Sequence, residues 1–265
     1  MIRKLKKYGV LPTKKTRVYW CSCTGNKNFG DVLAEYLAKK ITFNESLGCS
    51  KHCLRQYYAI TGSILGLTRK NAIIWGSGII RKNEKIRKPK EVFAVRGPLT
   101  RKRLLELGHS CPQVYGDPAL LLPFFYKPLN EKRYSLGIIP HYLDYKKVKR
   151  EKKNEGILVI NLKDPIEKVI EEINLCERTI SSSLHGLIVS HAYGIPSLWV
   201  KFSDNLPGDG IKFKDYLLSV NIFPYKPFDM RRKIPPKERI VELIRKNHKS
   251  PSIDTRRLWE SCPLR

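Results

Sequence analysis

Acidic side chains and long apolar runs are both scarce in this sequence. Its 24 Asp and Glu residues stand against 51 Lys and Arg, which gives a net charge of +27. No run approaches the roughly 20 apolar residues that a membrane span needs, so we expect no transmembrane helix. The basic start of the chain is not followed by an apolar segment, so we expect no signal peptide. Low-complexity segments and solenoid-period repeats are also missing, which excludes repeat architectures.

The seven cysteines include no second pair at zinc-ribbon spacing. Cys49, His52 and Cys53 lie close together, but a structural zinc site needs four ligands and no partner pair is evident. An odd number of cysteines at irregular spacing favours reduced thiols in a cytosolic protein. The sequence therefore predicts no metal site and a cytoplasmic location.

The excess of basic side chains predicts attraction to an anion: nucleic acid, an acidic membrane surface or a phosphorylated substrate. These side chains gather in blocks at residues 1–17, 81–90 and 146–153. No recognised DNA- or RNA-binding motif accompanies them, so we expect no nucleic-acid partner. Two alternatives stay open: a soluble lysine-rich surface, or peripheral association with the anionic inner face of the cytoplasmic membrane.

Short apolar runs alternate with stretches of helical spacing. The predicted strands are residues 17–21, 72–75, 92–95, 113–115, 134–139, 157–160, 179–181 and 197–200, and the predicted helices are 31–41, 98–107, 165–175 and 184–193. This alternation is typical of parallel sheets covered by helices on both faces. We predict an α/β fold with two Rossmann-like lobes, residues 1–128 and 129–265, and a cleft between the lobes. The C-terminal tail is expected to pack back on the first lobe.

Ligands of open parallel sheets bind beyond the carboxyl ends of the strands. The most informative such junction is at residues 180–196, where a strand runs into serines, then His185, then an apolar helix. Ser182 or Ser183 can cap this helix, whose first N–H groups attract anions. His185, in the first turn, is suited to donate to a phosphate or to move a proton. The alternative is that the serine only caps and His185 only packs.

Three other junctions carry candidate residues. Arg96 follows a strand, and its guanidinium suits a carboxylate or phosphate, unless it is a surface arginine paired with an acid. Asp31 follows Asn28 and Gly30 at another strand-to-helix turn, as a general base or merely an N-cap. Lys201 follows the last clear strand and is expected to line the cleft. Asp117 is interpreted as a turn residue rather than a catalyst.

Several of these motifs together resemble one enzyme family. Ser182-Ser183-Leu184-His185-Gly186, followed by Ala192, Gly194, Ile195 and Pro196, resembles the hallmark of the polysaccharide pyruvyltransferases, and residues 28–31, 95–100 and 116–119 resemble its other motifs in the expected order. The resemblance implies a GT-B-like fold and a transferase that uses phosphoenolpyruvate, without a metal or other cofactor, to form pyruvate ketals on capsular or exopolysaccharides. Many members have an arginine where this chain has Ser183, and Lys201 is our candidate for the missing cation.

The resemblance also implies the partners: phosphoenolpyruvate, and a lipid-linked oligosaccharide or polysaccharide acceptor. The expected catalytic residues are His185, Asp31 and Arg96, with His185 as the leading candidate for the acid that protonates phosphoenolpyruvate. The expected substrate-binding residues are Asn28, Gly30, Arg96, Ser182, Ser183, Leu184, His185, Gly186 and Lys201. Two alternatives remain: a GT-B-like glycosyltransferase using a nucleotide sugar, and a non-enzymatic basic protein that binds nucleic acid or membrane.

Overall fold

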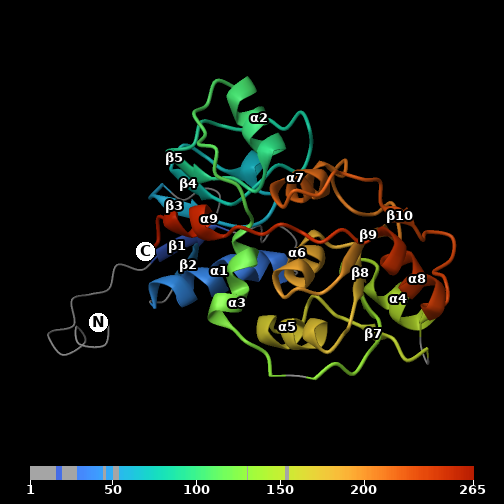
Figure 1. Cartoon of the computed structure of the whole chain (residues 1–265). Helices are drawn as coiled ribbons and strands as arrows, with labels where there is room; N and C mark the ends of the chain where they lie inside the picture. Colours follow the sequence, from blue (N-terminus) through green and yellow to red (C-terminus); the bar gives the residue numbers. More distant parts are fainter. Residues whose placement is uncertain (1–15, 20–28, 44–45, 50–53, 130, 153–154) are drawn as a thin grey trace, which may run out of the picture.

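Two five-stranded sheets organise the chain (Figure 1). The computed structural model describes residues 16–19, 29–43, 46–49, 54–129, 131–152 and 155–265. Within them, the first sheet has the strand order β2-β1-β3-β4-β5 and the second β10-β9-β8-β6-β7, and all of the paired strands are parallel. The predicted α/β class with two parallel, Rossmann-like sheets is confirmed.

The first lobe contains β1 (Thr16–Tyr19), α1 (Phe29–Thr42), β2 (Ser46–Cys49), β3 (Tyr57–Ala59), β4 (Ala72–Trp75), β5 (Glu91–Ala94) and α2 (Pro98–Glu106). A 3-10 turn, η3 (Pro118–Leu121), and α3 (Leu122–Phe125) lead out of it. The rest of the chain forms β6 (Gly137–Ile139), α4 (Tyr145–Glu151), β7 (Leu158–Val159), α5 (Ile166–Asn174), β8 (Thr179–Ser181), α6 (Leu184–Ala192), β9 (Ser197–Lys201), α7 (Ile211–Ser219), β10 (Phe228–Asp229), α8 (Lys237–Asn247) and α9 (Arg256–Glu260).

Apolar patterning explains the elements that the sequence predicts well. All four residues of β4 are buried, as expected for a parallel strand covered on both faces. Along α5, Ile166, Val169, Ile170 and Ile173 are buried at spacings of three and four, so one face of the helix packs on the core. The strand expected at 113–115 is wrong: Tyr115 forms one isolated bridge to Val95 between Pro112 and Gly116.

A shared hydrophobic core joins the two lobes. One cluster of buried residues includes Leu33 and Leu37 from α1 together with Val169 and Ile173 from α5. The Phe29 amide also donates to the Leu162 carbonyl oxygen at 2.7 Å. Because these contacts cross from one sheet system to the other, the first helix is anchored in both halves. The division at residue 128 stays a prediction.

Two helices from the second half of the sequence lie against the first lobe. Helix α7 packs on α2, and the chain after α8 runs back across the molecule to α9 (Figure 1). The indole Nε1 of Trp75 donates to the Leu258 carbonyl oxygen in α9 at 3.0 Å. The site at the carboxyl ends of the strands is therefore assembled from segments that are distant in sequence.

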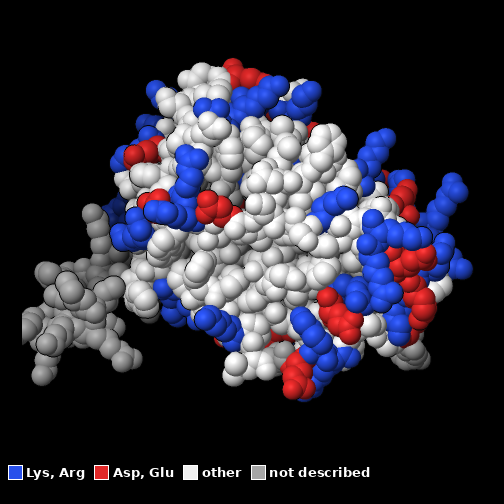
Figure 2. Space-filling model, viewed as in Figure 1, with Lys and Arg blue, Asp and Glu red and all other residues white. Residues whose placement is uncertain are grey.

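Charged side chains surround the face shown in Figure 2, while much of its centre is uncharged. Basic and acidic side chains are mixed over α4 and α8 at its edge. In the part of the chain that the structure describes, no helix combines the length and the apolar character needed to cross a bilayer. Of the three neighbouring residues Cys49, His52 and Cys53, the last two lie outside the described residues.

Candidate active site

One pocket collects residues from several strand-to-helix junctions of both lobes. It has a volume of about 380 Å³. The first lobe contributes Gly30, Asp31, Thr61, Gly62, Ser63, Ile64, Leu67, Ile80, Arg81 and Glu84, and the second half contributes His141, Tyr142, Ser183, Leu184, His185, Pro207 and Lys212. Of the residues predicted from the sequence, Gly30, Asp31, Ser183, Leu184 and His185 are therefore brought together.

The turn between β8 and α6 places His185 at this pocket. The Ser181 hydroxyl donates to the Ser183 carbonyl oxygen at 2.8 Å and accepts from the Ser183 amide at 3.0 Å, so the turn is held by its own strand. Ser183 is the N-cap residue, and its side chain makes no capping hydrogen bond to the helix. The positive end of α6 therefore points toward the pocket without a side-chain cap.

The imidazole of His185 is packed tightly, with a side-chain exposure of 12%. On one side lies Gly30, where an added Cβ would be 2.3 Å from Nδ1 of His185. On the other side, Nε2 lies 3.7 Å from Oδ2 of the buried Asp117. A glycine at position 30 is thus required for the ring to occupy this position.

Lys212, in α7, is the cation that the sequence analysis missed. It lines the pocket although its exposure is 9%. Burial first, and then the nearby Arg96 guanidinium, lower the pKa of Lys212 to about 8. His141 lies in the same pocket, and its burial, with a further contribution from Lys212, lowers its pKa to about 4. The sequence signal that could have indicated a buried cation here is the position of Lys212 beside Phe213, in a helix that follows Gly208-Asp209-Gly210.

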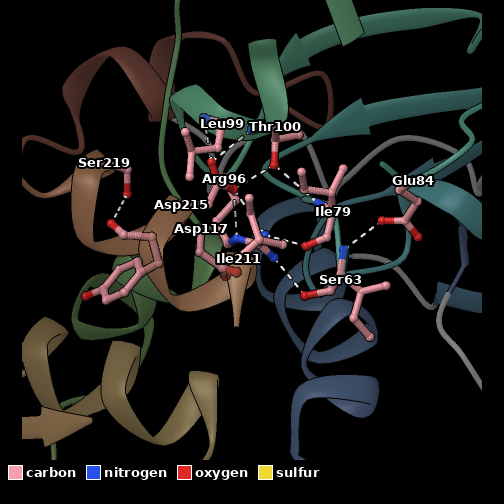
Figure 3. Close-up of polar contacts among 12 residues, drawn as sticks. Ser63, Ile79, Glu84, Arg96, Leu99, Thr100, Asp117, Ile211, Asp215 and Ser219 are labelled. Carbon is pink, nitrogen blue, oxygen red and sulfur yellow. Dashed lines mark hydrogen bonds and ion pairs between the residues drawn. The ribbon is translucent and has the colours of Figure 1, made fainter. Parts of the chain in front are cut away.

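Arg96 is buried in the protein and does not line the pocket. Its side chain is 0% exposed and forms an ion pair with Asp215 at 3.1 Å. The guanidinium also donates to the Ser63 hydroxyl at 2.8 Å and to the Ile79 carbonyl oxygen at 2.7 Å (Figure 3). Arg96 is paired with an acid, as one alternative from the sequence expected, but it is buried and not on the surface, and its Nε, Nη1 and Nη2 each donate a hydrogen bond within the protein.

Asp215 also occupies the start of helix α2. Its Oδ1 accepts from the amides of Leu99 and Thr100, both at 2.9 Å, and its Oδ2 accepts from the Thr100 hydroxyl at 2.6 Å (Figure 3). A carboxylate from α7 thereby caps a helix of the first lobe. An added Cβ at Gly97 would be 2.0 Å from the Asp215 carbonyl oxygen, so the two segments are in close contact.

Three further predicted binding residues, all among the described ones, do not line this pocket. Lys201, the last residue of β9, lines a neighbouring pocket of about 460 Å³ and forms an ion pair with Asp204. The Ser182 hydroxyl is buried and accepts from the His141 amide at 2.9 Å. Gly186 faces the sheet, where a Cβ would be 2.5 Å from the Ser181 hydroxyl. Asn28 lies outside the described residues.

A larger cavity, of about 600 Å³, lies apart from this chemistry. Phe124, Phe125 and Trp259 are among its lining residues, and it contains none of the predicted site residues. Among the described residues, no group of three or more His, Cys, Asp or Glu side chains is placed to hold a metal ion. The pocket around His185 therefore remains the candidate active site.

Comparison with known proteins identifies similar chains. The model of the family described as polysaccharide pyruvyl transferase matches residues 28–204. The uncharacterized protein L143 of Acanthamoeba polyphaga mimivirus is 32% identical over 217 residues, which cover 78% of this chain and 76% of the relative. The family match includes Gly30, Asp31, Asp117 and His185, whereas α7 lies beyond its end.

Proposed function

Because this chain belongs to the polysaccharide pyruvyl transferase family, we propose that it transfers the enolpyruvyl group of phosphoenolpyruvate to a sugar diol and forms a pyruvate ketal. The family itself indicates a transferase that acts on polysaccharide. The observation that carries the finer proposal is the convergence of His185, Lys212 and the start of α6 on one pocket. This set of groups suits a small ligand with two anionic ends.

Phosphoenolpyruvate presents a phosphate and a carboxylate, and each needs a hydrogen-bond donor or a cation. Lys212 supplies an ammonium group that, at a pKa of about 8, is largely protonated at neutral pH. The first amides of α6, at Leu184 to Gly186, supply donors and the positive end of a helix dipole. We assign the anionic groups of the donor to these two features, and Lys212 takes the role that was first expected of Lys201.

The reaction requires a proton at the methylene carbon and an oxygen at the central carbon. In our proposal, His185 protonates the methylene, so that the double-bond electrons form the new C–H bond and the central carbon becomes electrophilic. A sugar hydroxyl adds to that carbon, and its proton goes to Asp31. The C–O bond to phosphate breaks with its electron pair on phosphate, which Lys212 stabilises. A second hydroxyl of the sugar closes the ketal, and its proton leaves with phosphate.

In this proposal Arg96 supports the site without lining the pocket. Its guanidinium holds the Ser63 hydroxyl, and Ser63 lines the pocket. Its charge also contributes to the lowered pKa of Lys212. We therefore assign Arg96 to the support of the pocket instead of direct contact with phosphoenolpyruvate.

The direct test incubates the protein with phosphoenolpyruvate and a panel of lipid-linked oligosaccharides. Mass analysis should show a ketal on one acceptor, with inorganic phosphate released in equal amount. A thermal-shift comparison of phosphoenolpyruvate with uridine nucleotides separates this function from that of a nucleotide-sugar glycosyltransferase. Stabilisation by the nucleotides alone, with no phosphate release from phosphoenolpyruvate, would refute the proposal.

We also propose that the protein works at the cytoplasmic face of a membrane, where a lipid-linked acceptor would lie. The support is the charge: residues 1–17 hold seven basic side chains and no acid, and each basic residue near an anionic surface contributes about 1 kcal/mol. Vesicle co-sedimentation at low and high salt, with the full chain and with a chain that lacks residues 1–15, tests the idea, because residues 16 and 17 belong to β1. Equal binding to neutral and anionic vesicles, or binding to neither, would refute it.

A further inference from the structure

Two buried polar atoms of the site face each other, and neither has a hydrogen-bond partner among the residues that the structure describes. They are Oδ2 of Asp117 and Nε2 of His185, which lie 3.7 Å apart. Asp117 is fully buried, so bulk solvent does not reach its free oxygen. Buried side-chain polar atoms nearly always have a partner, and exceptions require an explanation. At 3.7 Å the two atoms are slightly too far apart for a hydrogen bond, and a shift of under about 1 Å would form one.

Both groups are held in these positions by their surroundings. The other oxygen of Asp117, Oδ1, accepts from the Ala119 amide at 3.0 Å, which fixes the plane of the carboxylate. The following Pro118 packs on Gly76, where an added Cβ would be 2.1 Å from the proline Cδ. The contact of the His185 ring with Gly30 limits rotation of the imidazole on its other side. These contacts keep the two side chains facing each other.

The geometry also distinguishes the two nitrogens of His185. Nε2 is buried and faces Asp117, whereas Nδ1 lies on the side of Gly30, which lines the pocket. A carboxylate beside one ring nitrogen keeps a proton on that nitrogen and leaves the other nitrogen to exchange protons with a substrate. The nitrogen available to the substrate is thus Nδ1.

We propose that Asp117 is the positioning residue of His185: it keeps the proton on Nε2, so that Nδ1 carries out the proton transfer. This inference rests on the proposed function. In the donor step, the imidazolium gives its Nδ1 proton to the methylene carbon and becomes the neutral Nε2–H tautomer, which Asp117 holds. Nδ1 regains a proton from water before the next turnover. Asp117 gains and loses no proton during the step.

The first test determines the tautomer of the wild-type protein. Nitrogen-15 NMR of the full chain, with the His185 signals assigned by their loss in His185→Gln, should show the neutral ring protonated at Nε2. A neutral ring protonated at Nδ1 would overturn the proposal. This measurement needs no substrate, so it is decided separately from the proposed function, which fails if the wild-type protein releases no phosphate from phosphoenolpyruvate with any acceptor.

The second test uses Asp117→Asn. The asparagine oxygen can keep the bond from the Ala119 amide, and its NH₂ group then donates to Nε2, which forces the proton onto Nδ1. We expect kcat to fall by about two orders of magnitude or more, with a KM for phosphoenolpyruvate within about threefold, because no group that binds the donor is removed. The NMR spectrum should show the Nδ1–H tautomer. Near-normal kcat with an unchanged tautomer would overturn the proposal.

The matched control is Asp144→Asn. Asp144 is another buried aspartate whose Oδ2 has no hydrogen-bond partner within the described part of the chain, and it is not among the residues that line the pocket. Its substitution should leave both kcat and the His185 tautomer unchanged. An equal fall in kcat for the two variants would assign the effect to general loss of a buried carboxylate and overturn the proposal. If Asp117→Asn does not fold by circular dichroism, the wild-type tautomer alone decides.

Discussion

The turn before α2 and the turn before α6 have the same local design and different surroundings. Each follows a parallel strand, and each presents the positive end of a helix. At α2, the Asp215 carboxylate accepts from the amides of Leu99 and Thr100, so the anion position is filled by the protein. At α6, the N-cap side chain makes no capping bond, and the turn borders the pocket. The comparison teaches that a third element, α7, decides which turn remains available to a ligand.

Helix α7 acts in opposite ways at the two turns. It supplies Asp215 to one, where an acid satisfies Arg96 and the start of α2, and Lys212 to the other, where a cation meets the pocket. Removing one partner of a buried ion pair strongly destabilises a protein, because the other charge stays buried without compensation. The α2 turn should therefore respond to mutation mainly in stability, and the α6 turn mainly in turnover.

The largest expected effect is a loss of stability in Asp215→Ala. This change leaves the Arg96 guanidinium buried without its counter-ion and the start of α2 without a cap. We expect the free energy of unfolding to fall by about 3–5 kcal/mol, measured by urea denaturation. Asp209→Ala is the control, because this exposed aspartate accepts hydrogen bonds from the amides of Lys82 and Ile211 near the start of α7, and its loss should cost about 1 kcal/mol. Equal losses in the two variants would contradict the comparison.

The α6 turn is tested by His185→Ala. Removal of a positioned acid should lower turnover with phosphoenolpyruvate by about two orders of magnitude or more, while the melting temperature changes little. His109→Ala is the control, because His109 lies near the Ile86 carbonyl oxygen, away from the pocket. Turnover that stays near normal in His185→Ala would remove His185 from the mechanism.

A smaller effect is expected from Gly30→Ala, which tests the position of the imidazole. The added Cβ would lie 2.3 Å from Nδ1 of His185, so the ring must move. We expect turnover to fall about tenfold to a hundredfold, since small misplacements of a reacting group have costs of that order. Because the added Cβ meets a packed ring, the free energy of unfolding should also fall, and the better helix propensity of alanine offsets only part of this loss. Unchanged turnover would show that the ring position is not critical.

Lys212→Met should act on binding. We expect the KM for phosphoenolpyruvate at pH 7 to rise about tenfold, the size of a lost charge-assisted hydrogen bond. In the wild-type protein, burial and then Arg96 lower the pKa of Lys212 to about 8. The ammonium form is present below that pH, so affinity should decrease as the pH rises through about 8. Lys201→Met is the control, and a larger effect there would restore Lys201 as the cation.

The lowered pKa of Lys212 also predicts how the free energy of unfolding changes with pH. The pKa of Lys212 is lowered from 10.5 in the reference state to about 8 in the folded protein. Between these values the unfolded chain binds more protons than the folded chain, so the free energy of unfolding should rise with pH. The difference between the wild-type protein and Lys212→Met, measured from pH 8 to 10.5, should show this rise. A difference that does not change with pH would contradict the lowered pKa.

No effect at all is expected from a metal chelator. The cationic roles are assigned to Lys212 and to the start of α6, so turnover should be the same in buffer with and without the chelator. Activity that disappears with chelator and returns with a divalent ion would show that a further charge is needed at the pocket. The description of the α6 turn would then have to include a bound divalent ion.

The secondary structure that the sequence could predict has strong local causes. Residues 72–75 and 179–181 were predicted as strands with the bounds that the structure shows, because each is a short buried run that is followed directly by glycine or serine. Strand β3 and helix α7 were not predicted, because neither segment has a long series of apolar residues at regular strand or helix spacing. The hallmark residues Leu184 and His185 were predicted at the pocket for the same local reason: a strand, a turn and a helix start follow each other directly.

Contacts between distant segments decided the rest. The sequence by itself determined an α/β chain of parallel strands with anion-attracting turns, because strand propensity, turn residues and helix starts are local properties. It did not determine that Asp215, 119 residues after Arg96, would bury that arginine, or that Lys212 and not Lys201 would reach the pocket. Nor could it assign Asp117 to His185, 68 residues later. A side chain's partner depends on which surfaces meet when α7 and η3 pack, and that is a property of the tertiary structure alone.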